Sequence, residues 1–488
     1  MKYLANLIIQ KKLVLVILFL SIISRYFTTI FYIEDIDSLR FFLSAYDYNV
    51  IEGRPHFPGY PFYCFFLKVI YYVTGSIEYS FSFIGALSVF LIVYYSNKLS
   101  YIFYQKNNYI LILLLIFNPL LWLMSNRYMP DILGLSFLLS ATFYYINFLK
   151  NKDPRNIIYL ALSIGILVGI RISYIPFLIP VIYLLKYDYK SFFKLTFLSI
   201  IFALFWFIPW VYITGLNEIY SLAIHDVNGH FFEWGGTINS GSSSLKYRLI
   251  MIFKSIFADG LGFWWNDRHY STLINLVFLV PFLFSGIIFT YKDLKKNFRI
   301  FFVILMCIVI YFFWILLYQN VVYKPRHVLP LIPFFLFIIS HGFIFFINKF
   351  KRFKYFFLIF FVPYLYVSVI INYQHQNIKS SLSQMHDYIQ NIENKSLIII
   401  SDNLKINYFK RNFYNYNDRR FKKIKYLTSN KFNNEKFMCN NGDCIIFSTS
   451  ELLSSDLLLV KQKHFFHNPY VNRLWDHLTI YEYEYKKK

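Results

Sequence analysis

Residues 13–33 read LVLVILFLSIISRYFTTIFYI and follow directly after Lys11 and Lys12. The run reaches the roughly 20 apolar residues that a helix needs to cross a lipid bilayer. It is too long for the core of a signal peptide, and no small-residue cleavage site follows it. We therefore expect a retained membrane helix whose N-terminus, marked by the two lysines, lies on the cytoplasmic side.

The composition extends this interpretation to the whole chain. Of 488 residues, 57% are hydrophobic, 23% are aromatic and only 15% are charged, whereas roughly a quarter of the residues in a soluble domain are charged. A single soluble core could not bury so much apolar surface. The composition therefore excludes a soluble enzyme, a fibrous protein and a disordered protein, and it predicts an all-α polytopic membrane protein.

Ten further apolar runs are long enough to be membrane helices. They lie at about 79–99, 109–125, 131–149, 156–170, 173–186, 192–213, 271–290, 298–318, 326–347 and 353–373. The total is about 11 spans, and the stretch 156–186 can be divided in more than one way.

The net charge of +23, from 49 Lys+Arg against 26 Asp+Glu, is explained by topology. When the spans alternate across the membrane, the basic clusters at 98–106, 150–155, 186–194, 292–299 and 349–354 all fall on one side. This is the positive-inside pattern of cytoplasmic loops, so the charge does not indicate a nucleic-acid partner. We expect an integral protein of the bacterial inner (plasma) membrane.

The same alternation places residues 34–78, residues 214–270 and the chain after 373 outside the cytoplasm. Residues 59–74 are predicted to form a helix along the outer interface; the alternative, a further span, would turn the basic loops outward. We therefore divide the chain into a membrane domain (1–373), which includes the first two outer loops, and an extracytoplasmic domain (374–488).

The C-terminal domain is predicted to be a small α/β fold. Residues 396–401, SLIIIS, read as a buried strand, and residues 444–448 and 480–485 also have strand patterns. A helix-like stretch follows Asp402. Cys439 and Cys444 flank a short polar turn, and they form either a disulfide, as an oxidising compartment permits, or two free thiols.

The first outer loop begins with a cluster of carboxylates, Glu34-Asp35-Ile36-Asp37. They lie at the membrane surface, where a lipid-linked substrate presents its head group. Paired acids can serve as a general base and as ligands of a divalent cation such as Mg²⁺ or Mn²⁺ at Asp35 and Asp37. Cationic side chains could neutralise a phosphate equally well, so the metal is not required. The alternative is a solvated acidic loop.

The next segment, residues 53–61, reads GRPHFPGYP. Its three prolines and two glycines impose an irregular, stiff backbone around Arg54 and His56. Such rigidity suits a site that must hold charged groups in place, although a structural turn would explain it too.

Further cations and polar residues are predicted on the same outer side of the membrane. They are Arg127 and Asp131 between two spans, Arg171 at an outer turn, and Arg326 and His327 before the tenth span. Charged residues at membrane depth are functional candidates, and the guanidinium group suits a phosphate. Interfacial anchoring is the alternative for each residue taken singly.

These motifs resemble the GT-C superfamily of membrane glycosyltransferases, which take sugars from polyprenyl-phosphate carriers and include protein O-mannosyltransferases and the aminoarabinose transferase of lipid A. The resemblance covers roughly residues 12–347. The most similar subgroup has Asp-Ser-Gly-Glu-Phe and His-Pro-Pro-Gly-Tyr-Pro-Leu-Tyr, where this chain has DSLRF (37–41) and HFPGYPFY (56–63). Arg40 and Phe57 depart from that pattern.

The resemblance implies a reaction and a set of site residues. The catalytic aspartate of the family corresponds to Asp37, with Asp35 as a second carboxylate, and an inverting transfer to a glycan, lipid or protein hydroxyl is expected. The donor phosphate would be held by Arg171, Arg54, Arg326 and His56, and the substrate would be contacted by Asp131, Arg127, Tyr60 and His327.

Two other functions remain as alternatives. A transporter or flippase of lipid-linked saccharides predicts charged residues in the middle of several spans and symmetry between two halves, and the sequence has neither. A polysaccharide polymerase or ligase also uses a large outer loop and cations, but it does not need carboxylates directly after the first helix.

Overall fold

The computed structural model describes residues 2–485 except 242, 295–297, 351–352, 393–395, 416–423, 429–443, 453, 455 and 469–472. The chain divides into two compact units. The first comprises Met1–Ile30 with Leu43–Tyr373, and the second comprises Phe31–Phe42 with Gln374–Lys488.

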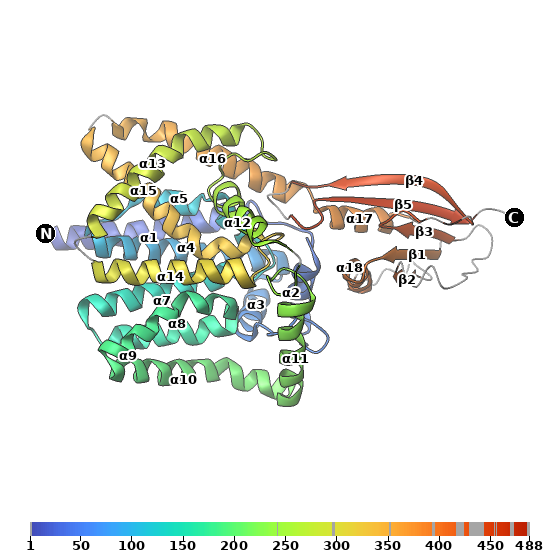
Figure 1. Ribbon diagram of the computed structural model, residues 1–488, viewed down its shortest axis with the longest axis horizontal. Helices are drawn as coiled ribbons and strands as arrows, with labels where there is room; N and C mark the ends of the chain where they lie inside the picture. The colour runs from blue at the N-terminus through green and yellow to red at the C-terminus, as the bar shows by residue number, and fades with distance from the viewer. Residues whose placement is uncertain are drawn as a thin grey trace. The chain divides into compact units, whose positions relative to one another are not determined.

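The first unit is built of helices, most of which run side by side in Figure 1. They are α1 (Lys2–Tyr26), α3 (Pro61–Thr74), α4 (Ile77–Tyr104), α5 (Tyr109–Ile116), α6 (Pro119–Asn126), α7 (Asp131–Asn151), α8 (Arg155–Arg171), η1 (Ile172–Ile182), α9 (Tyr183–Tyr187), α10 (Tyr189–Thr214), α11 (Leu216–Asn228), η2 (Gly229–Glu233), α12 (Leu245–Phe253), η3 (Lys254–Gly260), α13 (Ser271–Leu294), α14 (Phe298–Tyr318), η4 (Pro325–Leu331), α15 (Ile332–Lys349) and α16 (Phe353–Asn377). Helix α2 (Ile36–Tyr46) begins in the second unit and ends in the first.

The chain is an integral membrane protein. Among the described residues, seven helices are long and apolar enough to cross a membrane, or eight if α5 and α6, bent by 47°, count as one broken span. Helices α1 and α16 have 25 residues each, but some of their side chains lie outside the described set, so neither helix is included in this count. The predicted total of about 11 membrane spans therefore stays a prediction. Helix α3 has 14 residues and is not among the spanning helices, as expected for 59–74.

The helical stretch Arg155–Tyr187 reverses direction at Arg171. Three contacts to α7 show this, because Asn147 bonds Asn156, Asp131 pairs with Arg171, and Tyr145 then bonds the carbonyl of Pro180. The chain thus runs along α7 to its first residue and returns. The backbone of Arg171, at φ −155° and ψ 81°, breaks the helix there. The predicted division at 170–173 is therefore correct within this stretch.

The break between α5 and α6 is set by Pro119, whose ring lacks an N–H and cannot continue a helix. Asn118 caps the new helix by accepting from Leu121 N. The buried guanidinium of Arg25 donates to the carbonyl of Ile116 at 2.7 Å and to Ser125 Oγ at 3.1 Å. Arg25 therefore satisfies a carbonyl that the break leaves without its helical partner.

The second unit is the predicted α/β domain. Its five-stranded sheet has the order β2-β1-β3-β5-β4, with β1 parallel to β2 and β3 and with β5 antiparallel to β3 and β4. The elements are α17 (Ser381–Gln390), β1 (Ser396–Ser401), α18 (Asn403–Asn415), β2 (Ile424–Thr428), β3 (Cys444–Ser448), β4 (Leu457–Phe466) and β5 (His477–Tyr485). The strands predicted at 396–401, 444–448 and 480–485 are confirmed.

One face of this sheet forms a core of Ile398, Ile400, Leu427, Ile446 and Tyr483, as the two-residue period of strands requires. Cys444 is disulfide-bonded, while Cys439, its expected partner, lies outside the described residues. The sequence groups the acidic residues 34–37 with the membrane helices, whereas by contacts Phe31–Phe42 belongs to the second unit.

Candidate active site

A buried ionic cluster joins three ends of helices in the first unit. Arg171 Nη2 lies 3.0 Å from Asp131 Oδ1, and Arg326 Nε lies 3.9 Å from the same oxygen. The side chains are 8%, 1% and 7% exposed for Arg171, Asp131 and Arg326. Two guanidinium groups thus lie beside one carboxylate in a buried place.

Local sequence explains why these groups meet. Helix α7 begins at Asp131 after Pro130, while α8 ends at Arg171 and η4 contains Arg326. Gly134 allows the close approach, because a Cβ there would lie 2.7 Å from the Cβ of Arg171. Among the described residues no hydrogen-bond acceptor meets Arg171 Nε, so this N–H is available to an anionic ligand.

Tyr60 connects the cluster to His56. Its hydroxyl lies 3.1 Å from His56 Nε2 and 3.3 Å from Arg171 Nη1. The backbone of Gly59 has φ +75°, and its Cβ position is within 3 Å of Tyr48, Val50 and Trp210. Glycine is therefore required there, and the stiff segment predicted at 53–61 serves to place Tyr60 and His56.

Arg54, expected at the donor phosphate, has other partners in this structure. Its Nη2 lies 2.8 Å from Asp47 Oδ2 and 2.6 Å from Glu52 Oε2, two exposed carboxylates of the same loop. Its backbone pairs with Asn49 in both directions. A phosphate would have to compete with these acids for Arg54.

Arg127 and His327, expected at the substrate, are both buried. Arg127 Nη1 lies 3.9 Å from Met124 Sδ, and the His327 carbonyl accepts a hydrogen bond from Tyr311. Two residues that enclose the cluster, Met129 and Tyr174, were not indicated by the sequence. Met129 Sδ contacts Arg326, and the ring of Tyr174 flanks the guanidinium of Arg171 together with that of the predicted Tyr60. No motif distinguishes Met129 and Tyr174 from the other apolar and aromatic residues of the chain.

The acidic residues of the first loop lie in the second unit. Asp35 caps α2, because its Oδ1 accepts from the backbone N–H of Ser38 at 2.8 Å. Asp37 is in the first turn, where the helix dipole favours a negative charge, and Arg40 Nη1 lies 3.7 Å from its Oδ1. Arg40, which departs from the subgroup pattern, therefore compensates the charge of Asp37.

Partners of this loop come from the far end of the sequence. His375 Nε2 lies 3.1 Å from Glu34 Oε1, Ser380 Oγ donates to the Glu34 carbonyl at 2.7 Å, and Tyr408 donates to the Ile33 carbonyl at 2.9 Å. The sequence did not indicate these partners, because more than 340 positions separate each pair and no motif marks them.

A divalent cation at Asp35 and Asp37 stays a prediction. The described part of the chain contains no group of three or more His, Cys, Asp or Glu side chains that could hold a metal. A cation would also compete with the Ser38 N–H and with Arg40.

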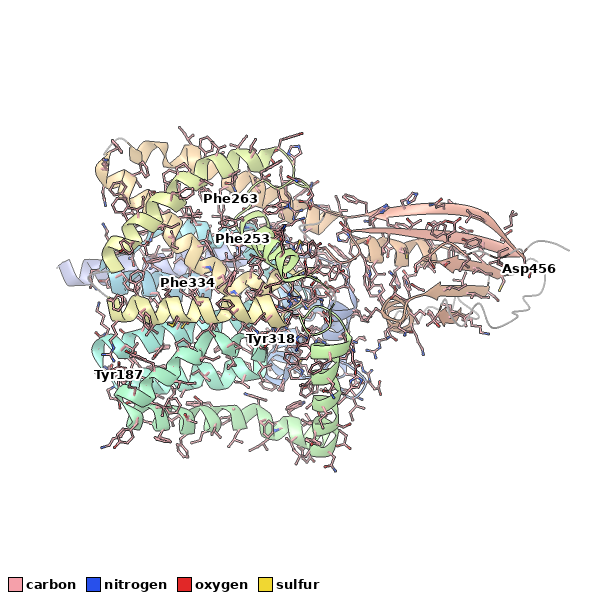
Figure 2. The ribbon with its side chains drawn as sticks, in the orientation of Figure 1. Tyr187, Phe253, Phe263, Tyr318, Phe334 and Asp456 are labelled. Carbon is pink, nitrogen blue, oxygen red and sulfur yellow. The ribbon has the colours of Figure 1, made fainter. Side chains whose placement is uncertain are left out.

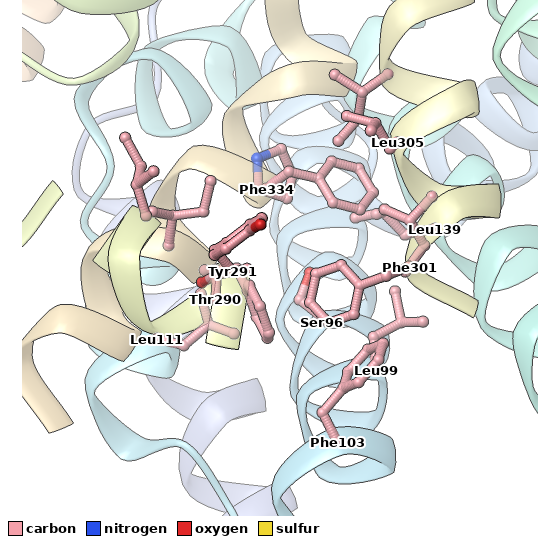
Figure 3. Close-up of a pocket in the computed structure, with 16 residues that line it drawn as sticks. Ser96, Leu99, Phe103, Leu111, Leu139, Thr290, Tyr291, Phe301, Leu305 and Phe334 are labelled. Atoms are coloured by element: carbon pink, nitrogen blue, oxygen red, sulfur yellow. The ribbon is translucent and has the colours of Figure 1, made fainter. Parts of the chain in front are cut away.

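A cavity of about 300 Å³ lies elsewhere in the helical unit (Figure 3). Its lining is almost entirely apolar and includes Leu99, Phe301 and Phe334. No residue of the ionic cluster lines it, so the cavity is separate from the candidate site. In Figure 2, Tyr187 and Tyr318 mark opposite ends of the helices, and Phe334 lies between these ends.

Comparison with solved structures identifies the architecture. The crystal structure of ArnT from Cupriavidus metallidurans bound to undecaprenyl phosphate superposes with a TM-score of 0.55 at 13% identity, covering 98% of both chains. The fold is that of ArnT. The same ArnT in the apo state gives a TM-score of 0.51 at 12% identity over 99% of this chain and 98% of that chain.

A second similar structure is the Archaeoglobus fulgidus oligosaccharyltransferase tethered to an acceptor peptide that contains the NVT sequon. It has a TM-score of 0.50 and 14% identity, covering 82% of this chain and 63% of that enzyme. No protein-family model and no curated protein sequence matches the chain. The similarity to ArnT confirms the predicted GT-C fold with a C-terminal sheet domain.

Proposed function

We propose that this protein is an inverting glycosyltransferase that moves a sugar from a polyprenyl-phosphate donor to a hydroxyl acceptor on the extracytoplasmic face of the membrane. The observation that carries the proposal is the buried pair of guanidinium groups, Arg171 and Arg326, beside the carboxylate of Asp131. Charged side chains at membrane depth are functional candidates. The planar guanidinium fork can bind phosphate oxygens in a bidentate manner, so two such groups side by side suit a phosphate.

In the reaction, Asp37 takes the proton from the acceptor hydroxyl as general base. The hydroxyl oxygen attacks the anomeric carbon from the face opposite the phosphate, and the bond from that carbon to the phosphate oxygen breaks. The bonding electron pair goes to the leaving phosphate, where Arg171 and Arg326 stabilise the new charge. Attack from the opposite face inverts the configuration of the sugar.

The other residues of the cluster have supporting roles. Asp131 and Tyr60 hold Arg171 from two sides, and His56 holds Tyr60, so that the guanidinium keeps its orientation as charge develops. Arg54, Arg127 and His327 are proposed to contact the substrate. Since the cations can neutralise the phosphate, a divalent ion at Asp35 and Asp37 would supply only additional stabilisation.

The fold supports a polyprenyl-phosphate donor, because ArnT was crystallised with undecaprenyl phosphate. The fold does not indicate which kind of acceptor is used. The archaeal oligosaccharyltransferase, whose structure has a tethered acceptor peptide, also resembles this chain. We therefore propose a glycan, lipid or protein acceptor at the inner membrane of a bacterium, with a cytoplasmic N-terminus and an extracytoplasmic second unit.

The test is mass spectrometry of glycolipids, surface glycans and glycoproteins from four strains at equal expression. They contain wild-type protein, a deletion, Asp37→Asn, or the control Asp153→Asn, which changes a partly exposed carboxylate paired with Arg155. One sugar should disappear in the deletion and in Asp37→Asn while its polyprenyl-phosphate donor accumulates, and Asp153→Asn should match wild type. Wild-type glycans in Asp37→Asn would refute the base assignment and favour a transporter of lipid-linked sugars.

A further inference from the structure

Within the second unit, the residues directly before Asp35 and Asp37 are held by hydrogen bonds from the C-terminal part of the chain. Tyr32 donates to the His375 carbonyl at 2.7 Å, Tyr408 donates to the Ile33 carbonyl, and His375 and Ser380 bond Glu34. Three consecutive residues are thus held by groups from α16, from α17's cap and from α18. The next residue in the chain is Asp35.

These contacts are shielded from water. Glu34 is 1% exposed, and His375, Tyr408 and Ser380 are between 0% and 1% exposed. Buried hydrogen bonds of this kind hold one geometry, because breaking any of them leaves a polar group without a partner. The bonds to the carbonyls of Ile33 and Glu34 fix the backbone itself, so they constrain the residues that follow.

The constraint continues to Asp37 through α2. The backbone of residues 33 and 34 leads into Asp35, whose side chain caps the helix at Ser38 N. The capped first turn contains Asp37, and helical hydrogen bonds begin with Leu39 N on the Asp35 carbonyl at 3.0 Å. A shift of the Glu34 carbonyl would therefore move the cap and turn the Asp37 side chain.

We propose that His375, Ser380 and Tyr408 are positioning residues for Asp37, so that the C-terminal α/β unit is the scaffold of the catalytic base. This inference rests on the proposed function, in which Asp37 is that base. A displacement of about 1 Å at a reacting group can lower the rate about 100-fold. The donor phosphate is proposed to be bound by Arg171 and Arg326, so loosening the loop should lower kcat and leave the KM for the donor unchanged.

The experiment uses the full chain in membranes of the deletion strain, supplied with the polyprenyl-phosphate sugar that accumulates in that strain. Tyr408→Phe removes the hydroxyl on the Ile33 carbonyl and keeps the ring. Tyr388→Phe is the matched control, because Tyr388 belongs to the same unit and its hydroxyl donates to Glu482. We expect kcat to fall at least 10-fold in Tyr408→Phe with donor KM unchanged, and Tyr388→Phe to behave as wild type.

A double-mutant cycle separates positioning from general damage to the fold. In the Asp37→Glu background the carboxylate is already displaced, so Tyr408→Phe should lower kcat there by less than about 3-fold. The same loss in both backgrounds, or a loss accompanied by a raised donor KM, would overturn the positioning role. His375→Gln, measured in the same cycle, provides a second variant in case Tyr408→Phe reduces the amount of folded protein.

The two proposals fail differently. If Asp37→Asn is inactive while Tyr408→Phe and His375→Gln are fully active or purely additive, the positioning role is wrong and the base assignment stands. If Asp37→Asn is as active as wild type, the base assignment is wrong, and the positioning role fails with it.

Discussion

Arg171 Nη2 lies 3.0 Å from Asp131 Oδ1, and this ion pair ties the last residue of α8 to the first residue of α7. Both side chains are almost completely buried, so their attraction offsets part of the desolvation penalty of each. The pair therefore has two roles: it closes the reversal of the chain after α8, and it orients the guanidinium that we propose binds the donor phosphate.

Replacement of Arg171 should affect activity and stability together. Arg171→Gln removes the nearer counter-ion of the buried Asp131 carboxylate and leaves only Arg326 at 3.9 Å, which should destabilise the protein by about 3 kcal/mol. The loss of a cation at the leaving phosphate should lower kcat at least about 100-fold. Thermal unfolding and initial rates measure the two effects.

The double variant Arg171→Gln/Asp131→Asn distinguishes these effects. Neutralising both partners should restore most of the stability and none of the activity. Recovered activity in the double variant would show that Arg171 is structural only.

Tyr60 should matter through its hydroxyl group. Tyr60→Phe removes the bonds to His56 and Arg171 while it keeps the ring against the guanidinium. A lost hydrogen bond of about 1–1.5 kcal/mol corresponds to a decrease of roughly 5- to 10-fold in kcat/KM. Tyr72→Phe, at a highly exposed position of the same helix α3, is the control. Equal rates in both variants would contradict the role of Tyr60.

Gly85 is expected to be intolerant of any side chain. A Cβ at this position would lie 1.8 Å from the carbonyl oxygen of Ser125, where α4 packs against α6. Gly85→Ala must push the helices apart, and we expect a loss of about 1–3 kcal/mol in thermal unfolding of the purified protein. Ser88→Ala, which removes only a bond to the Ile84 carbonyl one turn away, should change stability by less than about 0.5 kcal/mol. Equal stability of both variants would refute this packing.

The second unit should lose stability in mild acid. Burial lowers the pKa of His386 below its ordinary value, opposed by Asp387 Oδ1 at 3.8 Å. The unfolded chain therefore binds more protons than the folded one, and stability that is present above about pH 6.5 falls by up to about 1.4 kcal/mol per pH unit as the pH drops.

Amide hydrogen exchange of α17, corrected for intrinsic rates, measures this effect. Exchange should accelerate from pH 7 to pH 5 in wild type and change little in His386→Leu. The control His464→Leu alters an exposed histidine bonded to Thr479 and should keep the wild-type dependence. An unchanged pH dependence in His386→Leu would exclude this histidine as its source.

The fold class could be predicted from the sequence because two of its signals, the apolar runs and the strand patterns, are local. Apolar runs of spanning length and strands such as 396–401 depend only on neighbouring residues. The stiff segment at 53–61 and the cations Arg171 and Arg326 were also recognisable, since charge at membrane depth is rare. Topology alone predicted that these cations and Asp131 lie on the same outer side of the membrane, and the structure brings the three side chains together.

The rest depended on contacts between distant parts of the chain. No motif near Glu34 indicates that it bonds His375, and none near Ile33 indicates that its carbonyl accepts from Tyr408. The partners of Arg54 could not be foreseen either, because Asp47 and Glu52 are ordinary loop carboxylates until the turn at Asn49 brings them close. Hydrogen bonds of this kind involve common residue types, so they cannot be predicted from composition or from the spacing of residues.

The buried Arg25 has a consequence for the order in which the protein is made. Its acceptors, the Ile116 carbonyl and Ser125 Oγ, follow it by 91 and 100 residues. At a synthesis rate of about 5–20 residues per second, these acceptors are synthesised roughly 5–20 seconds after Arg25. During that interval the guanidinium must stay at the membrane surface or with the insertion machinery. Helix α1 therefore reaches its final depth in the membrane only after α5 and α6 have been synthesised and inserted.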